Sequence, residues 1–464
     1  MQHLHIIGIC GTAMAGLAAH AQESGWHVTG SDAAVYPPMS TFLAARNIPV
    51  ADGYRAENLH PAPNLVLVGN AISRGNPELE YTLEHNIPFR SGAEWLFDHV
   101  LEGRHPIVIT GTHGKTTTAS LTAWLWECAG LQPGFLIGGI PSNFGVGARF
   151  PKQAWVVVEG DEYDTAFCDK RPKFLHYHPR TLILHNLEFD HADIYPDLEA
   201  IRRQFRLLLR IVPASGRILA NADDPEITAI ASQAYGPVMR YGLHGAPPFS
   251  ARLEQADGRV WTLLVDGKAR LRVEWQLLGH HNVMNGLAAA AAALSHGIDD
   301  AIVQRGLATF AGVARRLQLR YISGGVAVYD DFAHHPTAIT TTLQGLRAAV
   351  GKQRVWAVLE PRSNTMRTRV HQEKLPAALN IADHVILARP ALRGLTPDTL
   401  LDVEAVVDRL NEFSPDKAVV VDDAGQAVKY LAKSVRSGDH VVIMSNGGFD
   451  NIHHRLQEML ANLG

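Results

Sequence analysis

Residues 111–117 read Gly111-Thr112-His113-Gly114-Lys115-Thr116-Thr117. They follow a short apolar run, residues 106–110, which predicts a buried strand. They precede a segment with apolar side chains at helical spacing, residues 121–128. A strand, a glycine-containing turn ending in Gly-Lys-Thr, and a helix are the context in which phosphate-binding loops occur. The stretch therefore predicts a nucleotide-binding domain of the α/β class.

The chemistry of such a loop assigns a role to each residue type. Glycines let backbone N–H groups face phosphate oxygens, and the helix N-terminus adds partial positive charge. Lys115 would neutralise the β- and γ-phosphates of ATP, and the Thr116 hydroxyl would bind Mg²⁺. The standard pattern has an earlier glycine where this chain has Ile109. The plainer alternative is a tight turn that carries a surface lysine.

Acidic and histidine side chains follow two further apolar runs. Residues 154–158 are apolar and are followed by Glu159, while residues 181–185 lead into an acidic segment that contains His191. Ligands of open α/β sheets bind at the carboxyl ends of strands. Glu159 is therefore a candidate magnesium ligand beside Thr116, and His191 is a candidate for a second ion. A solvated loop around Glu159 and a hydrogen-bonding role for His191 are the alternatives.

Short apolar segments alternate with helical patterns along most of the chain, which predicts an α/β protein. We expect three domains: residues 1–105, Rossmann-like; residues 106–313, the central phosphate-loop ATPase domain; and residues 314–464, again Rossmann-like. In the last of these, the expected strands are residues 326–329, 354–359, 384–387, 418–421 and 440–444.

A glycine turn also follows the first expected strand, residues 3–7. A dinucleotide-binding turn would have glycine at positions 8, 10 and 13, where this chain has Gly8, Cys10 and Ala13. The turn is therefore a weak match to a nicotinamide site, but it can present N–H groups to any pyrophosphate, including that of a UDP-sugar. The candidate contacts are Gly8, Gly11, Thr12 and Asp32. Asp32 as a simple cap is the alternative.

Composition excludes several classes of function. The chain has 464 residues and a formal net charge of -4, so it shows no basic excess for nucleic acid. The longest apolar run, residues 287–294, is too short to span a bilayer, and we expect no membrane insertion. The N-terminus lacks the pattern of a signal peptide. Three widely spaced cysteines suit a reducing compartment, so we expect a cytoplasmic protein.

Three later motifs make the prediction specific. They are His280-His281-Asn282-Val283-Met284-Asn285-Gly286, Ala314-Arg315-Arg316-Leu317-Gln318, and Tyr329-Asp330-Asp331-Phe332-Ala333-His334-His335-Pro336-Thr337. Together with the phosphate loop, and in this order, they resemble the Mur ligase family of peptidoglycan synthesis. The resemblance covers nearly the whole chain.

The resemblance implies an ATP-dependent ligase that forms an amide bond. A carboxylate on a UDP-linked sugar is phosphorylated by ATP, and an amine then displaces phosphate from the acyl phosphate. It implies that His281, Asn282 and Asn285 contact adenine, that Arg316 reaches the γ-phosphate, and that Asp331 holds the ribose. His334 would line the site of acyl transfer. Helix capping by the two asparagines and an interdomain ion pair by Arg316 are the alternatives.

Two branches of the family are nearest, and both use UDP-N-acetylmuramate. One attaches the murein tripeptide L-alanyl-γ-D-glutamyl-meso-diaminopimelate in peptidoglycan recycling, and several local sequences resemble it, including Cys10 and the stretch from Leu359 to Met366. The other attaches L-alanine and is the alternative. The tripeptide needs donors for its carboxylates at strand ends. The candidates are Arg362, Ser363, Asn364, Ser445 and Asn446.

Two reaction classes outside this family are alternatives. A nicotinamide-dependent oxidoreductase would leave Lys115, Glu159 and the motif at 280–286 without a role. A phosphate-loop ATPase or kinase acting as a switch would leave the first glycine turn without one. The ligase is the hypothesis that uses all of these motifs.

Overall fold

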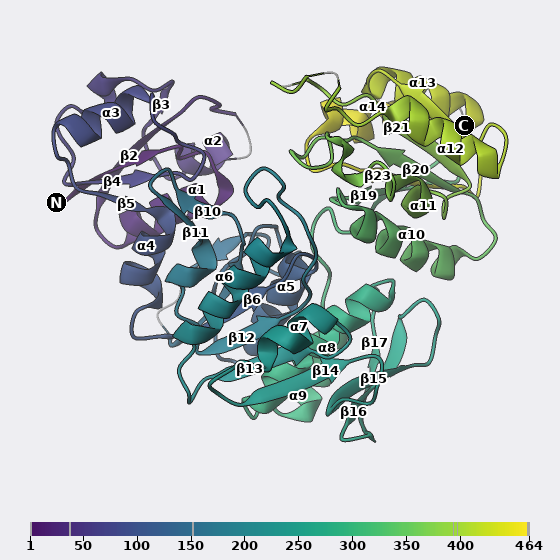
Figure 1. Cartoon of the computed structure of the whole chain (residues 1–464), viewed down its shortest axis with the longest axis horizontal. Helices are drawn as coiled ribbons and strands as arrows, with labels where there is room; N and C mark the ends of the chain where they lie inside the picture. The colour runs from purple at the N-terminus through teal and green to yellow at the C-terminus, as the bar shows by residue number, and fades with distance from the viewer. Residues whose placement is uncertain (1, 37–38, 151–152, 393, 397, 462–464) are drawn as a thin grey trace.

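The computed structural model describes the chain except residues 1, 37–38, 151–152, 393, 397 and 462–464. Three large sheets follow one another along the chain, and each lies in a lobe of its own (Figure 1). The N-terminal and C-terminal lobes lie on either side above the central lobe in that view. The prediction of a three-part α/β fold is confirmed.

The N-terminal lobe is a parallel sheet of five strands in the order β3-β2-β1-β4-β5. The two strands at its centre, β1 and β4, are mostly buried, as is typical of parallel sheets covered on both faces. The strands are β1 (His3–Ile7), β2 (His27–Asp32), β3 (Val50–Asp52), β4 (Leu65–Val68) and β5 (Phe89–Ser91). The helices are α1 (Thr12–Glu23), α2 (Met39–Ala44), η1 (Ala56–Leu59), α3 (Pro77–Glu84), α4 (Gly92–Leu96) and η2 (Phe97–Leu101).

The central lobe holds a ten-stranded sheet with the order β17-β16-β15-β14-β13-β12-β6-β9-β7-β8. The strand before the phosphate loop, β6 (His105–Thr110), lies between β9 (Trp155–Gly160) and β12 (Thr181–Leu184), and all three are parallel. The carboxyl ends of these strands therefore meet at one edge of the sheet. The other strands are β7 (Gly134–Leu136), β8 (Ala148–Arg149), β13 (Arg217–Asn221), β14 (Val238–Gly242), β15 (Phe249–Leu253), β16 (Val260–Val265) and β17 (Lys268–Glu274).

Two helices of the central lobe pack closely beside this edge, α5 (Lys115–Cys128) and α8 (His280–Ser295). Residues 288–293 of α8 are six buried alanines, whose small side chains allow the close approach. The remaining elements are β10 (Asp164–Ala166), β11 (Asp169–Pro172), η3 (Lys173–His176), α6 (Leu198–Ile211), α7 (Pro225–Ala231) and α9 (Asp300–Ala308).

The C-terminal lobe has a six-stranded sheet in the order β18-β19-β23-β20-β21-β22, parallel except for the edge strand β18. The strands are β18 (Gln318–Ser323), β19 (Val326–Asp331), β20 (Val355–Leu359), β21 (His384–Ala388), β22 (Ala418–Val421) and β23 (His440–Met444). The helices are α10 (Pro336–Val350), η4 (Arg369–His371), α11 (Leu375–Leu379), α12 (Val403–Phe413), α13 (Ala424–Ser434), η5 (Phe449–Asn451) and α14 (Ile452–Ala461).

Candidate functional site

The phosphate loop joins β6 to α5 and depends on its two glycines. Gly111 has a φ of 144° and Gly114 a φ of 80°, values that L side chains rarely adopt. A Cβ on Gly114 would lie 2.5 Å from Asn285 Oδ1 and 2.9 Å from His185 Nε2. Thr112 is fixed by the segment that follows β12, because its hydroxyl accepts from the N–H of Glu188 at 2.9 Å. The loop therefore has one tightly packed conformation.

Lys115 points back into the loop and meets a carboxylate. Its Nζ donates to Gly111 O at 2.6 Å and to Glu162 Oε2 at 2.6 Å, and both charged side chains are nearly buried. Burial alone would lower the pKa of Lys115, but the negative charge of Glu162 and its neighbours raises it. The ammonium is therefore charged at neutral pH and ready to neutralise phosphate.

Thr116 and Glu159 lie together, as their sequence positions predict. The Thr116 hydroxyl donates to Glu159 Oε1 at 2.9 Å, and Gly138 N donates to Glu159 Oε2 at 2.7 Å. Arg316 reaches the same threonine from the C-terminal side, with its Nη2 3.0 Å from Thr116 Oγ1. A hydroxyl and a carboxylate beside the phosphate loop are oxygen donors of the kind that Mg²⁺ prefers.

His191 is bound to Glu162 rather than lying beside Thr116 and Glu159. Its Nε2 lies 3.0 Å from Glu162 Oε1, and its backbone has a φ of 57°. Burial is the largest single influence and lowers the pKa of His191, but the hydrogen bond to Glu162 and the negative charges of Glu162 and Asp190 together raise it, and the net shift is upward. Glu162 thus joins His191 to Lys115. The sequence pattern did not single out Glu162, although it belongs to the acidic segment directly after β9.

The three polar residues of α8 take different positions. The helix starts at His280 with Gly279 as its N-cap, so Asn282 and Asn285 are inside the helix and do not cap it. Asn285 Nδ2 donates to Asn282 Oδ1 at 3.1 Å, and Asn285 Oδ1 accepts from the Thr118 hydroxyl at 3.2 Å. The first bond lies within α8, and the second fixes α8 against the phosphate-loop helix α5.

His281 differs from the asparagines. Its Nδ1 is buried and has no hydrogen-bond partner among the described residues, and burial lowers the pKa of His281 to about 4. This nitrogen lies against the backbone of Gly279, where an added Cβ would be 2.7 Å from it.

Asp331 and His334 follow β19 and are held by their own lobe. Asp331 accepts from Leu317 N at 2.6 Å and from Ala333 N at 2.7 Å, which fixes the turn that presents Arg316. Burial raises the pKa of Asp331. His334 Nδ1 lies 2.8 Å from Phe332 O, and burial lowers the pKa of this histidine. Because Nδ1 is committed to the carbonyl, Nε2 of His334 is left as an acceptor.

A cluster of polar side chains joins the central and C-terminal lobes beside the phosphate loop. Glu188 Oε2 accepts from the Thr337 hydroxyl at 2.6 Å, and it lies 3.5 Å from His113 Nε2 and 3.7 Å from His335 Nδ1. Burial alone would raise the pKa of Glu188, but these partners lower it to about 2. His113, predicted as a loop residue that binds ATP, thus also contributes to the junction between lobes.

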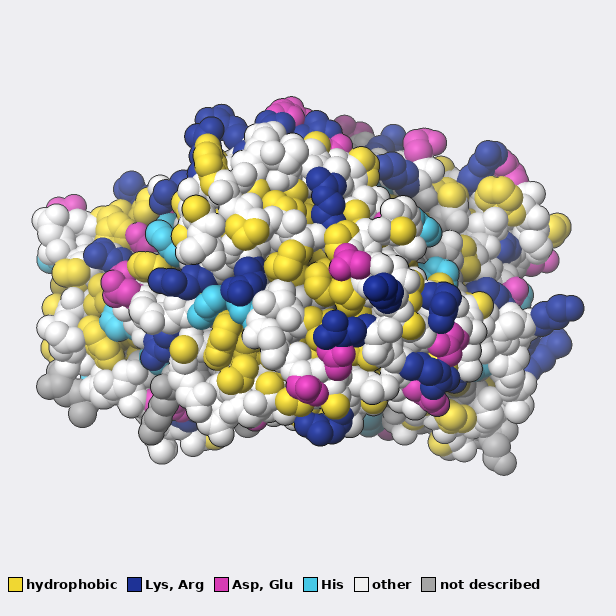
Figure 2. Space-filling view, turned by 90° about the horizontal axis from the view of Figure 1, so that it is seen from below, with side chains coloured by type: hydrophobic (Ala, Val, Ile, Leu, Met, Phe, Trp, Pro, Cys, Tyr) yellow, Lys and Arg dark blue, Asp and Glu magenta, His cyan; other side chains and the backbone are white. Residues whose placement is uncertain are grey.

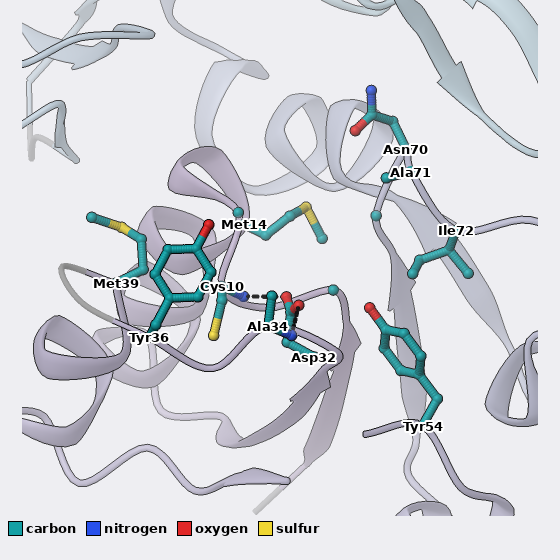
Figure 3. A pocket seen from close by; sticks show the side chains of 13 residues that line it. Cys10, Met14, Asp32, Ala34, Tyr36, Met39, Tyr54, Asn70, Ala71 and Ile72 are labelled. Atoms are coloured by element: carbon teal, nitrogen blue, oxygen red, sulfur yellow. Dashed lines mark hydrogen bonds between the residues drawn. The ribbon is translucent and has the colours of Figure 1, made fainter. Parts of the chain in front are cut away.

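The first glycine turn lines a cavity of about 380 Å³ in the N-terminal lobe. Asp32 lies at its centre, and its carboxylate accepts from Cys10 N at 2.9 Å and from Ala34 N at 3.0 Å (Figure 3). Tyr36 and Tyr54 lie on opposite sides of it. Tyr54, Asn70 and Ile72 also line the cavity, and they were not singled out in the sequence, because no local pattern shows that the segments after β3 and β4 meet there.

The predicted pyrophosphate contacts are placed as follows. Gly8, Gly11 and Asp32 line this cavity, and Gly11 is the N-cap of α1. The side chain of Thr12 lies outside the part of the chain that the structure describes.

The five residues predicted to bind peptide lie on two loops at the carboxyl edge of the C-terminal sheet. Arg362 crosses over Gly447, where a Cβ would lie 2.3 Å from Arg362 Nε. The Ser445 hydroxyl donates to Glu360 at 2.5 Å. Asn364 donates to Asp193 of the central lobe at 2.8 Å, so it also joins the two lobes. Ser363 has a bond within its own loop, where its Oγ accepts from Met366 N at 3.1 Å. Asn446 Oδ1 is buried.

The distribution of charged side chains on the surface agrees with the small net charge of the chain. On the face drawn in Figure 2, basic and acidic side chains are interspersed, with apolar side chains between them. Among the described residues, no helix combines the length and the apolar character needed to cross a bilayer.

Family models match all three lobes. Residues 3–103 match "Mur ligase family, catalytic domain", residues 109–293 match "Mur ligase middle domain", and residues 315–447 match "Mur ligase, glutamate ligase domain".

Individual relatives extend over the full chain. The chain is 47% identical, over 99% of its length and 98% of the relative, to UDP-N-acetylmuramate–L-alanyl-γ-D-glutamyl-meso-2,6-diaminoheptandioate ligase of Escherichia coli K12. It is 33% identical, over 99% of its length and all of the relative, to UDP-N-acetylmuramate–L-alanine ligase of Rubrobacter xylanophilus. A crystal structure of a murein peptide ligase from Psychrobacter arcticus 273-4 matches with a TM-score of 0.76 and 39% identity, covering 100% of this chain and 99% of that one.

Proposed function

The chain belongs to the Mur ligase family, and we propose that it joins L-alanyl-γ-D-glutamyl-meso-diaminopimelate to UDP-N-acetylmuramate at the expense of ATP. The bond formed is an amide between the muramate carboxylate and the α-amine of the tripeptide. The reaction belongs to peptidoglycan recycling, and we place it in the cytoplasm. The 47% identity to a ligase with this name, against 33% to an alanine ligase, favours the tripeptide as acceptor.

The observation that best supports this reaction type is the hydrogen bond from Arg316 to Thr116. It brings a guanidinium of the C-terminal lobe to the hydroxyl beside Lys115, although 200 residues separate the two side chains in sequence. Two cations supplied by different lobes then face the position of a bound γ-phosphate. Stabilising the charge of a transferring phosphoryl group is the main demand of this chemistry.

We assign the remaining roles from the geometry described above. Residues 111–117 hold the phosphates of ATP, with Lys115 leaving Glu162 to pair with them. His281, Asn282 and Asn285 contact the adenine, and Asp331 holds the ribose. His334 lines the acyl-transfer site with its free Nε2. Gly8, Gly11, Thr12 and Asp32 serve the UDP portion, and the chain divides into domains near residues 105 and 313.

Magnesium fits the donor set, since Thr116 and Glu159 offer two oxygens at the loop. A bound ion there would supply charge neutralisation for the phosphates. We propose His191, with Glu162 beside it, for a second ion.

Replacing either Glu159 or His191 by alanine is expected to raise the Mg²⁺ concentration that gives half-maximal activity by about tenfold or more, because each change deletes a ligand. Titration of phosphate release against Mg²⁺ measures this. Glu199→Ala, which removes an exposed carboxylate of α6, is the matched control. Unchanged titrations in both test variants would exclude the two-ion site.

The reaction class is tested by omitting substrates one at a time. Phosphate release is expected only when ATP, UDP-N-acetylmuramate and an amine acceptor are all present, because the acyl phosphate must form and then be consumed. Release of phosphate from ATP alone would instead indicate a switch-type ATPase, and reduction of a nicotinamide cofactor would indicate an oxidoreductase.

A further inference from the structure

Two histidines and a glutamate meet between the central and C-terminal lobes, beside the phosphate loop. They are His113 of the loop, Glu188 in the segment after β12, and His335 at the N-cap of α10. Glu188 Oε2 lies 3.5 Å from His113 Nε2 and 3.7 Å from His335 Nδ1. Around a tetrahedral ion with bonds of about 2.1 Å, donor atoms lie about 3.4 Å apart. The three side chains therefore have the spacing of metal ligands.

His113 contributes a nitrogen that the described part of the chain leaves without a hydrogen bond. Its Nε2 is buried, and Glu188 Oε2 at 3.5 Å is beyond the normal length of an N–H···O bond. The backbone of His113 is held by Asn186, which accepts from His113 N at 2.7 Å and donates to His113 O at 3.0 Å. A buried polar atom without a partner requires an explanation, and a bound ion supplies one.

His335 offers an imidazole from the other lobe. Its Nδ1 accepts a long hydrogen bond, of 3.3 Å, from Thr337 N, so this nitrogen carries a lone pair. Burial, and after it the neighbouring His113, lowers the pKa of His335 to about 3, which keeps the ring neutral at pH 7. A neutral imidazole is the form that binds metals. An ion would replace the long bond from Thr337 N.

Glu188 supplies negative charge and a path from solvent. Its side chain is 38% exposed, whereas those of His113 and His335 are 19% and 5% exposed. The Thr337 hydroxyl donates to Glu188 Oε2 at 2.6 Å, and outer partners of this kind orient metal ligands. An ion that enters along Glu188 thus meets ligands that are already oriented.

The types of donor atom select the ion. Mg²⁺ prefers oxygen ligands in octahedral geometry, which two imidazoles do not provide. Two histidines and one glutamate, with a fourth position left to water, form a donor set that occurs in zinc enzymes. The oxygen donors Thr116 and Glu159 differ from this set, so magnesium and zinc would be sorted by ligand type.

We propose that His113, Glu188 and His335 form a zinc site that links the central lobe to the C-terminal lobe. The ligands are His113 Nε2, a carboxylate oxygen of Glu188 and His335 Nδ1, and water completes the tetrahedron. Zinc bound there ties the phosphate loop to the start of α10 by coordinate bonds. The site is independent of the proposed reaction, because neither ATP nor the UDP-sugar nor the acceptor takes part in it.

The test measures zinc binding by the full chain, free of any polyhistidine tag and without nucleotide. Zn²⁺ is titrated in competition with a chromophoric chelator, with Mg²⁺ in excess to fill sites that prefer magnesium. The ligand variants are His113→Ala, Glu188→Gln and His335→Asn. Asparagine is a good N-cap residue, so the last change removes the imidazole and keeps a cap for α10.

Three further variants serve as controls. His454→Ala removes an exposed histidine of α14, and Cys168→Ser removes an exposed thiol, which is the other side chain on the surface with high affinity for zinc. His191→Ala removes the histidine proposed for the second magnesium ion. All three should bind zinc as the wild type does.

The wild type is expected to bind one Zn²⁺ per chain with a Kd of about 1 μM or below. Each ligand variant should raise this Kd by about tenfold or more, because it deletes a ligand. Zn²⁺ should also raise the melting temperature of the wild type, since an ion that binds only the folded chain stabilises it. The ligand variants should lose this rise.

Absence of stoichiometric zinc binding by the wild type would overturn the site. An unchanged Kd in the ligand variants, with folding verified by circular dichroism, would do the same. Loss of binding in His191→Ala or Cys168→Ser would place the ion at those side chains and would equally exclude the proposed site. The ligase reaction is tested separately, by the dependence of phosphate release on its substrates.

Discussion

Replacing Lys115 by alanine is expected to reduce phosphate release by about a hundredfold or more. The change removes the one ammonium that lies inside the phosphate loop, where it is nearly buried and paired with Glu162. Loss of a single charged contact to a transition state costs roughly 3–4 kcal/mol, which corresponds to this factor. The measurement is kcat for phosphate release with all substrates saturating.

The control for this variant is Lys170→Ala, which removes an exposed lysine that pairs with Asp164. It should keep wild-type activity. Both variants should retain the wild-type circular dichroism spectrum, because an alanine fits in either position. Near-normal turnover by Lys115→Ala in a folded protein would remove the phosphate-loop assignment.

Arg316→Ala is expected to lower kcat by a similar factor, about a hundredfold, because Arg316 supplies the second cation at the γ-phosphate from the other lobe. Arg316→Lys keeps the charge but loses the planar fork, so it should remain impaired. A defect in kcat with little change in the KM for the UDP-sugar would distinguish this role from a general loss of substrate binding.

Arg320→Ala is the matched control for Arg316, since Arg320 is exposed on the edge strand β18. It should behave as the wild type. If Arg316→Lys matched the wild type, the bond to Thr116 would be a structural contact between lobes and nothing more.

Much of the fold could be predicted because parallel strands buried on both faces are continuous apolar runs. The expected strands at residues 418–421 and 440–444 coincide with β22 and β23, and that at 384–387 is one residue short of β21. The antiparallel extension β15–β17 was not predicted. Exposed polar residues alternate along β17, and nothing in a local pattern tells which strand pairs with it.

The candidate site was predictable where chemistry and position coincide in one segment. Thr116 and Glu159 could be placed together because Glu159 is near the carboxyl end of β9, and Thr116 follows the phosphate loop after the neighbouring parallel strand β6. Pairings across long sequence separations could not be predicted. Glu162 became visible only when the fold brought Lys115 and His191 to its two oxygens.

Residues whose side chains could also have a local structural role could not be assigned from the sequence either. Asn282 and Asn285 could have been helix caps, and only the start of α8 at His280 excludes this. Asn364 was predicted as a peptide contact, and its bond to Asp193 adds a contact between lobes that no local pattern indicates.

The central claim, that the chain adds a tripeptide to UDP-N-acetylmuramate, is tested most directly by comparing acceptors. Acceptor-dependent phosphate release is measured with ATP, Mg²⁺ and UDP-N-acetylmuramate, using either the meso-diaminopimelate tripeptide or free L-alanine. The account predicts efficient release with the tripeptide, formation of UDP-N-acetylmuramoyl-tripeptide by mass spectrometry, and little or no release with L-alanine. Efficient use of L-alanine, with the tripeptide ignored, would contradict it and would make the chain an alanine-adding ligase.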